Sequence, residues 1–259
     1  MPPQKIRVAV LPAEIEVSIT KLSQIQSSAP KLSPEAQKAR IAQAMNIASR
    51  QITAALEKDI GASYFFSVIP ATKTAQALQN AGITSFSKKL SAKQAAGLGK
   101  ILDAQALVLV DVAGYGTLKK KWLFYLLGSG LIEGLTQGII VNAAVSNPWA
   151  AVGVGVEEAA QETAEWTGGF YVFNWAFTPV VLEARMISPF DGSILWSKTA
   201  IAARNPQAVK ALAKKDRRKR ELRLKVVADK AVRILAKSLN SIAWRNLKNA
   251  RPNLGHTEK

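Results

Sequence analysis

Cysteine is missing from this 259-residue chain, and histidine occurs once, as His256 near the carboxyl end. Without cysteine the chain can form no disulfide, no thiol nucleophile and no cysteine-ligated zinc or iron–sulfur site. A Ser-His-Asp triad or a histidine-rich metal site has almost no residues to be built from. We therefore expect no catalytic residues, no bound metal and no cofactor, and we expect that the protein is not an enzyme.

A secretion signal is also missing at the amino end, where Met1-Pro2-Pro3-Gln4 leads straight into an expected strand. Such a signal combines positive charge, an apolar run and small residues. If the protein is exported, this sequence is therefore its mature or engineered form. The composition also differs from that of disordered chains, which have few apolar residues. Here 48% of the residues are hydrophobic, which is enough to bury a core.

Acidic residues are scarce, and the resulting formal charge of +17 is unevenly distributed. Between Arg204 and Arg251 there are 16 basic and three acidic residues, whereas residues 122–166 contain five glutamates and no basic residue. We therefore divide the chain into three regions. These are an α/β body at 1–119 and 167–203, an apolar and acidic insert at 120–166, and a basic helix and tail at 204–259.

Hydrophobic periodicity predicts the elements of the body. Apolar and alternating runs predict strands near 5–11, 64–69 and 106–112, the last apolar enough for a central position in a sheet. Apolar residues at steps of three and four predict a helix near 34–58, and a short helix at 71–80 comes next. Ser91 and Gln94 form a capping-box pattern, which predicts a further helix that runs to about residue 102.

The remaining elements lie after the insert. Two predicted strands, at 179–187 and 193–200, flank Asp191-Gly192, which is the pattern of a β-hairpin. Apolar steps of three and four then predict an amphipathic helix near 217–248 with a charged outer face. This order of strands and helices predicts an α/β fold, a layer sandwich with a mixed sheet.

The stretch Gly97-Leu98-Gly99-Lys100 has some of the letters of a phosphate-binding loop. The full pattern needs glycine where Gln94 stands and serine or threonine where Ile101 stands, between a strand and a helix start. This stretch instead falls within or at the end of a predicted helix. We therefore do not expect a nucleotide site there.

The insert opens with its most apolar stretch, residues 122–145, in which Glu133 is the only charged residue. Gly130, Gly134 and Gly138 recur at every fourth position, and such a stripe lets helix backbones approach closely. As a helix this stretch would measure roughly 36 Å, long enough to cross a hydrocarbon layer of about 30 Å. Glu133, however, would cost on the order of 3 kcal/mol near the middle of a membrane.

A second, amphipathic segment comes after Pro148, so we interpret 120–166 as an apolar helical hairpin inserted into the body. Three occupants of its apolar surface stay open: the sheet of its own subunit, neighbouring subunits in a ring or bundle, and a membrane. The predicted association surface consists of aromatic, aliphatic and glycine residues: Trp122, Leu126, Leu127, Gly130, Leu131, Gly134, Gly138, Ile139 and Trp149.

The second candidate site is the densest cluster of basic residues, at 214–220, which we predict to be a basic docking face. Counterion release lets such clusters bind nucleic-acid backbones, but no aromatic residue is interleaved with these cations. Anionic lipid headgroups, peptidoglycan-associated polyanions or the insert glutamates of a neighbouring copy would satisfy the same charges. We expect a solvated or headgroup-facing helix rather than a nucleic-acid site. The face comprises Lys214, Lys215, Arg217, Arg218, Lys219 and Arg220.

Three strings of the body resemble those of a known group. They are Val8-Ala9-Val10-Leu11-Pro12, the helix-to-strand passage at 98–109, and the hairpin at 182–187 and 191–196. Together they resemble the envelope lipoprotein superfamily that includes the curli secretion channel, the penicillin-binding-protein activator lipoproteins and the amino-terminal domain of TolB. The resemblance covers about 1–119 and 178–203 and implies a TolB-like or CsgG-like α/β sandwich.

The resemblance implies a non-enzymatic periplasmic or outer-membrane-associated protein that acts by assembly. We therefore expect a cell-envelope scaffold whose partner is a second copy of the chain or another envelope protein, with possible membrane contact through the insert. One alternative is a subunit of an oligomeric outer-membrane secretion or export channel, and another is a nucleic-acid-binding module that uses the basic tail. The lipidated cysteine common in the group is missing here, and the insert looks helical where the channel members insert β-hairpins.

Overall fold

The computed structural model describes residues 5–28, 30, 32–84, 90–117, 178–203 and 209–250, with side chains up to Ser241. These residues make up the body and the carboxyl-terminal helix. The predicted helical hairpin at 120–166 lies outside the described residues, and so does His256. No helix in this described part is both long and apolar enough to cross a membrane.

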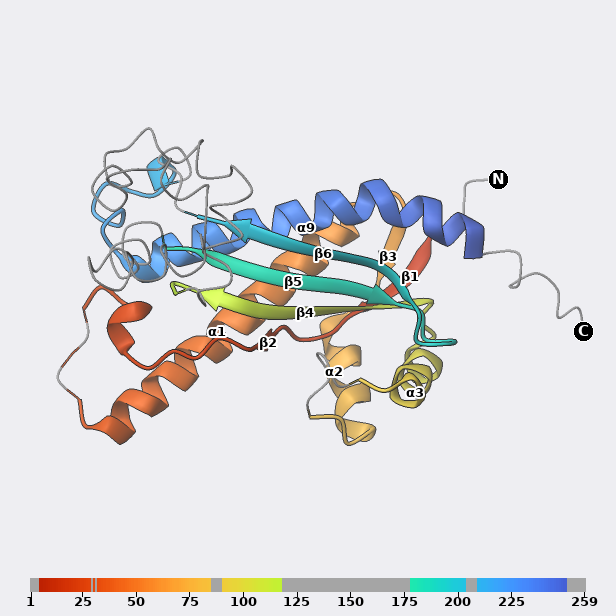
Figure 1. The fold of residues 1–259 in the computed structure, drawn as a ribbon, viewed down its shortest axis with the longest axis horizontal. Helices are drawn as coiled ribbons and strands as arrows, with labels where there is room; N and C mark the ends of the chain where they lie inside the picture. The colour runs from red at the N-terminus through yellow and green to blue at the C-terminus, as the bar shows by residue number, and fades with distance from the viewer. Residues whose placement is uncertain are drawn as a thin grey trace, which may run out of the picture.

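The described residues form a mixed sheet with four α-helices, which confirms the predicted α/β class (Figure 1). The strands are β1 (Ile6–Val10), β2 (Glu14–Ile15), β3 (Phe66–Val68), β4 (Ala106–Tyr115), β5 (Val180–Ile187) and β6 (Ile194–Ala202). The helices are α1 (Pro34–Gly61), α2 (Ala71–Asn80), α3 (Ala92–Leu102) and α9 (Arg220–Ala250), with a 3-10 turn η1 (Leu22–Gln24).

The strand order is β3-β1-β4-β5-β6. β1 pairs in parallel with β3 and β4, and the predicted hairpin adds β5 and β6 antiparallel to β4. β4 is central and all ten of its residues are buried, as its apolar sequence predicts. The two-residue strand β2, which no sequence pattern predicted, pairs with β4 beyond the end of β1.

Helices cover both faces of the sheet, because side chains of successive strand residues point to opposite faces. Val108 and Val110 of β4 pack into a core that includes the buried sides of α1 and α9. Leu107 and Leu109 pack into a separate core with α2 and α3. In Figure 1 α9 runs along the sheet above β6, whereas α2 and α3 lie below β4. The basic carboxyl-terminal helix is therefore an integral part of the folded body.

Local signals explain where the helices begin and end. The Ser33 hydroxyl accepts a hydrogen bond from the amide of Ala36 at 3.3 Å, so α1 starts at Pro34 as predicted. Ser91 and Gln94 form the predicted capping box at the start of α3. Asp103 ends α3 in the left-handed conformation, with φ of 49°.

Several predicted boundaries differ from the structure: α1 continues to Gly61 and β4 to Tyr115, each three residues past its predicted end. The strand expected at 64–69 is confined to Phe66–Val68, and Tyr64 is exposed. The last helix begins at Arg220 instead of about 217, because residues 214–218 form turns in which the amides of Asp216 and Arg217 both donate to the Ala213 carbonyl. Most of the predicted basic docking face therefore lies in a turn before the helix.

Candidate docking site

A compact cationic segment at residues 209–219 leads into α9, and we call it the cationic turn. It lies at the end of the sheet where β4 ends and β5 begins, at the left in Figure 1. The chain leaves the body for residues 118–177 at this same end and returns to it there. Five of the six predicted docking cations belong to this segment, and the sixth, Arg220, opens α9.

Arg217 holds the turn in shape from within. Its Nε donates to the Leu212 carbonyl at 3.0 Å, and its Nη2 donates to the Lys210 carbonyl at 3.0 Å. Val209, at the start of the turn, is buried and adds an apolar anchor. Arg217 therefore stabilises the backbone that carries the other cations, and its own guanidinium is already hydrogen bonded.

Arg220 is not available for docking, in contrast to the prediction, because only 3% of it is exposed. Its Nε donates to the Gln24 carbonyl at 2.6 Å, and its Nη2 donates to the Gly116 carbonyl at 2.7 Å. These bonds join η1, the end of β4 and the start of α9. Sequence reasoning missed this role because the partners lie 196 and 104 residues away.

Ser27 extends the same junction. Its hydroxyl donates to the Arg218 carbonyl at 3.0 Å and accepts from the amide of Arg220. Its own amide donates to Oε2 of Glu221 at 3.1 Å. A helix start leaves amides without partners in the helix, and Ser27 satisfies one of these from a distant loop. The orientation of the cationic turn is thereby fixed relative to the sheet.

Gly116 allows the close approach at this junction. Its φ is +70°, and an added Cβ would lie 2.4 Å from the Gln24 carbonyl oxygen. The same Cβ would also press on Leu224 of α9, at 3.2 Å. Only glycine combines this backbone conformation with that space. The glycine gave no recognisable sequence signal, since nothing local to it requires a turn of this kind.

Among the residues that the structure describes, Lys219 is the cation of the turn that forms an ion pair. Its Nζ lies 2.8 Å from Oδ1 of Asp216. The hydrogen bond from Lys219 lowers the pKa of Asp216, and the same bond raises the pKa of Lys219. Asp216 is the only acidic residue of the turn, so its charge is already committed.

Four further cations of the turn are exposed: Lys210, Lys214, Lys215 and Arg218. Within the part of the chain that the structure describes, their side chains form no hydrogen bond or ion pair. Lys214, Lys215 and Arg218 belong to the predicted docking face, and Lys210 was not predicted. These four exposed side chains project from a backbone that the hydrogen bonds of Arg217 and Arg220 hold in place.

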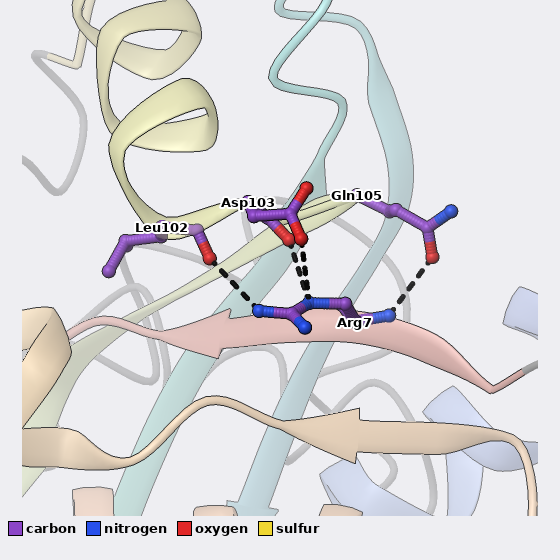
Figure 2. A network of polar contacts seen from close by, with 4 residues as sticks. All are labelled: Arg7, Leu102, Asp103 and Gln105. Atoms are coloured by element: carbon purple, nitrogen blue, oxygen red, sulfur yellow. Dashed lines mark hydrogen bonds and ion pairs between the residues drawn. The ribbon is translucent and has the colours of Figure 1, made fainter.

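Figure 2 shows a second polar network, around Arg7 of β1. Arg7 Nε donates to the Asp103 carbonyl at 2.9 Å, and Nη2 donates to the Leu102 carbonyl at 3.4 Å. Nε also lies 3.5 Å from Oδ2 of Asp103, and the Gln105 side chain accepts from the Arg7 amide at 3.0 Å. A cation at the end of α3 satisfies free carbonyls and favours the helix dipole. The Arg7 network is therefore explained by its role in ending α3, and we do not treat it as a candidate binding site.

An open groove of about 460 Å³ lies between the end of α1 and α9. Its lining includes Asp59, Arg233 and Lys237, so charges of both signs meet there. Asp229, nearby on α9, interacts with Lys225 and Arg233, although burial is the larger effect and raises its pKa. The positive charge of α9 is therefore partly compensated by acids, as that of the cationic turn is by Asp216.

The predicted association surface lies outside the described residues in its entirety: Trp122, Leu126, Leu127, Gly130, Leu131, Gly134, Gly138, Ile139 and Trp149. The glycines at 97 and 99 lie inside α3, so this stretch does not have the strand-to-helix context of a phosphate-binding loop. An added Cβ on Gly99 would lie 2.3 Å from the Cβ of Pro189, which shows that Gly99 permits close packing of α3 on the β5–β6 turn.

Comparison with known proteins finds no matching family model and no matching curated protein. Two solved structures are similar at low identity. The hypothetical protein CT253 from Chlamydia trachomatis has 10% identity and a TM-score of 0.43, over 93% of this chain and 98% of that one. Lipoprotein GNA1162 from Neisseria meningitidis has 13% identity and a TM-score of 0.31, over 78% and 82% of the respective chains.

Proposed function

We propose that this protein is a non-enzymatic assembly module of the bacterial cell envelope, which acts by associating with itself or with an envelope partner. One observation carries the proposal. The cationic turn, the end of β4 and the start of β5 lie at one end of the sheet, where Arg220 Nη2 donates to the Gly116 carbonyl.

The composition supports a non-enzymatic role, because the chain has no cysteine and a single histidine. Arg7, Arg217 and Arg220 each donate to backbone carbonyls of their own chain. The periplasmic, outer-membrane-associated location that we propose rests on the resemblance of the strings at 8–12, 98–109 and 182–196 to envelope lipoproteins.

Association would be driven by the apolar residues of the insert. Burying a leucine or isoleucine side chain stabilises a contact by roughly 1.5–3 kcal/mol. Glycines at every fourth position would set the close approach of the partner. An assembly built in this way depends on hydrophobic burial and therefore persists at high salt concentration.

Light scattering of the purified full chain, without detergent, tests this proposal. We expect a mass above the 27.9 kDa of one chain, rising with concentration and retained at 0.5 M salt. Leu131→Glu, in the predicted association surface, should lower that mass. Ile101→Glu is the matched control, because Ile101 is 57% exposed on α3 and does not belong to the predicted association surface. A monomer at every concentration, or equal effects of the two variants, would overturn the proposal.

A further inference from the structure

We propose that the cationic turn is a binding site for the headgroups of anionic phospholipids, which places this end of the sheet against a membrane surface. The inference deepens the proposed envelope function and rests on it. The ligands are Lys210, Lys214, Lys215 and Arg218, the four exposed cations of residues 209–219 that form no ion pair with any other described residue. Arg217 and Arg220 are positioning residues that shape the turn from within.

Among the residues that the structure describes, the turn has a higher density of positive charge than α9, with six basic residues and one acid in its eleven positions. Asp216 is bound to Lys219 at 2.8 Å, and no second acid lies between residues 209 and 219. Asp216 also interacts with Lys215, and on α9 Lys225 and Arg233 interact with Asp229 in the same way. Clustered cations attract the negative surface of a membrane in proportion to their number within about a Debye length, so the turn is the stronger site.

The turn is also preorganised. Its backbone is fixed by Arg217 at the Lys210 and Leu212 carbonyls and by Ser27 at the Arg218 carbonyl. A surface that is already ordered loses little conformational freedom when it binds. Only the lysine and arginine side chains need to adjust, and this suits headgroups that themselves move in the plane of a bilayer.

The residue types favour a lipid surface over nucleic acid. Residues 209–219 contain no aromatic side chain on which a base could stack. Arg218 is the only exposed arginine of the turn, so the bidentate contacts that read base edges are scarce. Three of the four ligands are lysines, whose compact ammonium charges bind phosphate oxygens without fixed geometry.

Sedimentation with sucrose-loaded vesicles tests the inference on the full chain. The vesicles contain either phosphatidylcholine alone or phosphatidylcholine with 30% phosphatidylglycerol. We expect binding only to the second kind, and a steep loss of binding as salt rises from 0.05 to 0.3 M. Because each cation near an anionic surface contributes about fivefold, the triple variant Lys214→Gln, Lys215→Gln, Arg218→Gln should lower the partition coefficient by roughly 100-fold.

The control triple variant is Lys225→Gln, Arg233→Gln, Lys237→Gln, which removes the same amount of charge from exposed positions on α9. Two of these residues, Lys225 and Arg233, interact with Asp229. The control variant should lower binding by less than about threefold. Equal losses in the two triple variants would overturn the inference, because net charge alone would then explain binding. The thermal midpoint of each variant reports folding, and the double variant Lys214→Glu, Lys215→Glu replaces the turn triple variant if that variant unfolds.

Two further outcomes would also overturn the inference. One is tight, salt-sensitive binding to a double-stranded DNA oligonucleotide with no binding to the anionic vesicles. The other is vesicle binding that the turn variants leave unchanged. Failure of the lipid site is distinguishable from failure of the proposed function, because light scattering of the turn variants without lipid reports self-association separately and should match the parent chain.

Discussion

Arg220 is a buried charged residue whose hydrogen bonds join three distant segments of the described chain. Its guanidinium is buried and binds carbonyls from η1 and from the end of β4, while its amide binds Ser27. A buried carbonyl that loses its donor destabilises the fold, because the carbonyl stays shielded from water without a hydrogen bond to replace those that water made. Arg218, two residues earlier, projects into solvent from the same chain segment.

This contrast predicts opposite results for two neighbouring arginines. Arg220→Met preserves much of the apolar volume but leaves the Gln24 and Gly116 carbonyls without their donor, and should lower the free energy of unfolding by about 3 kcal/mol. Arg218→Met should change it by no more than about 0.5 kcal/mol. Urea denaturation followed by circular dichroism measures both. Similar costs for the two variants would contradict the assigned role of Arg220.

Asp229 predicts a pH-dependent gain in stability. Burial raises its pKa from the ordinary 3.8, and the cations Lys225 and Arg233 only partly offset this. The folded protein therefore favours the protonated carboxyl, so the ionised form costs stability once the pH exceeds both its unfolded and its folded pKa. Asp229→Asn should raise the thermal midpoint at pH 7, and the gain should vanish as the pH falls below 3.8.

Asp216 is the control for this titration. Lys219 lowers the pKa of Asp216, so its ionised form is favoured by folding and Asp216→Asn should not raise the midpoint at any pH. Scanning calorimetry from pH 3 to pH 8 compares the two variants. A gain for Asp229→Asn that persists at pH 3 would show that the effect is unrelated to ionisation.

At the scale of elements, we expect alanine substitutions at two glycines of α3 to change stability in opposite directions. Alanine normally stabilises a helix interior relative to glycine by about 1 kcal/mol. Gly97→Ala should show this gain, because nothing lies within 4 Å of the added Cβ. Gly99→Ala should instead cost about 1–3 kcal/mol, because its Cβ would lie 2.3 Å from that of Pro189 in the β5–β6 turn. Thermal unfolding of both variants measures the difference.

The cationic turn and α9 show how a helix boundary is set by distant contacts. The sequence from Lys214 onward is compatible with a helix, but the helix starts only at Arg220, where Ser27 satisfies an amide. The cations just before it are therefore presented by turns instead of being spread around a helix. This concentrates their charge at one end of the sheet.

At the scale of the whole molecule, β4 couples two cores. Val108 and Val110 face the α1 and α9 core, while Leu107 and Leu109 face the α2 and α3 core. Neither core can lose its packing without exposing one face of the same central strand. We therefore expect the described body to unfold as one cooperative unit.

Truncations in each core test this expectation. Leu98→Ala in α3 and Leu235→Ala in α9 remove fully buried side chains, and each should cost about 2–5 kcal/mol. Hydrogen exchange, read by mass spectrometry on peptides from α3 and α9, should accelerate in both helices for either variant. Acceleration confined to the helix that carries the substitution would show that the two layers unfold independently.

The sequence alone predicted the elements whose signals are local. Ser33 and Pro34 located the start of α1, Ser91 and Gln94 the start of α3, and Asp191-Gly192 the turn between β5 and β6. The uninterrupted apolar run at 106–112 placed β4 at the centre of the sheet. Caps, turns and periodicity involve residues within a few positions of one another, so no distant partner is needed to recognise them.

Only the tertiary structure decided which basic residues are exposed and which are internal supports. Lys214 and Arg220 are equally basic in the sequence, yet one is exposed and the other is buried against carbonyls of Gln24 and Gly116. The two-residue strand β2 likewise exists only because β4 offers it hydrogen-bonding partners. The physical reason is that burial and hydrogen bonding between distant segments depend on how the chain folds back on itself, which no local pattern encodes.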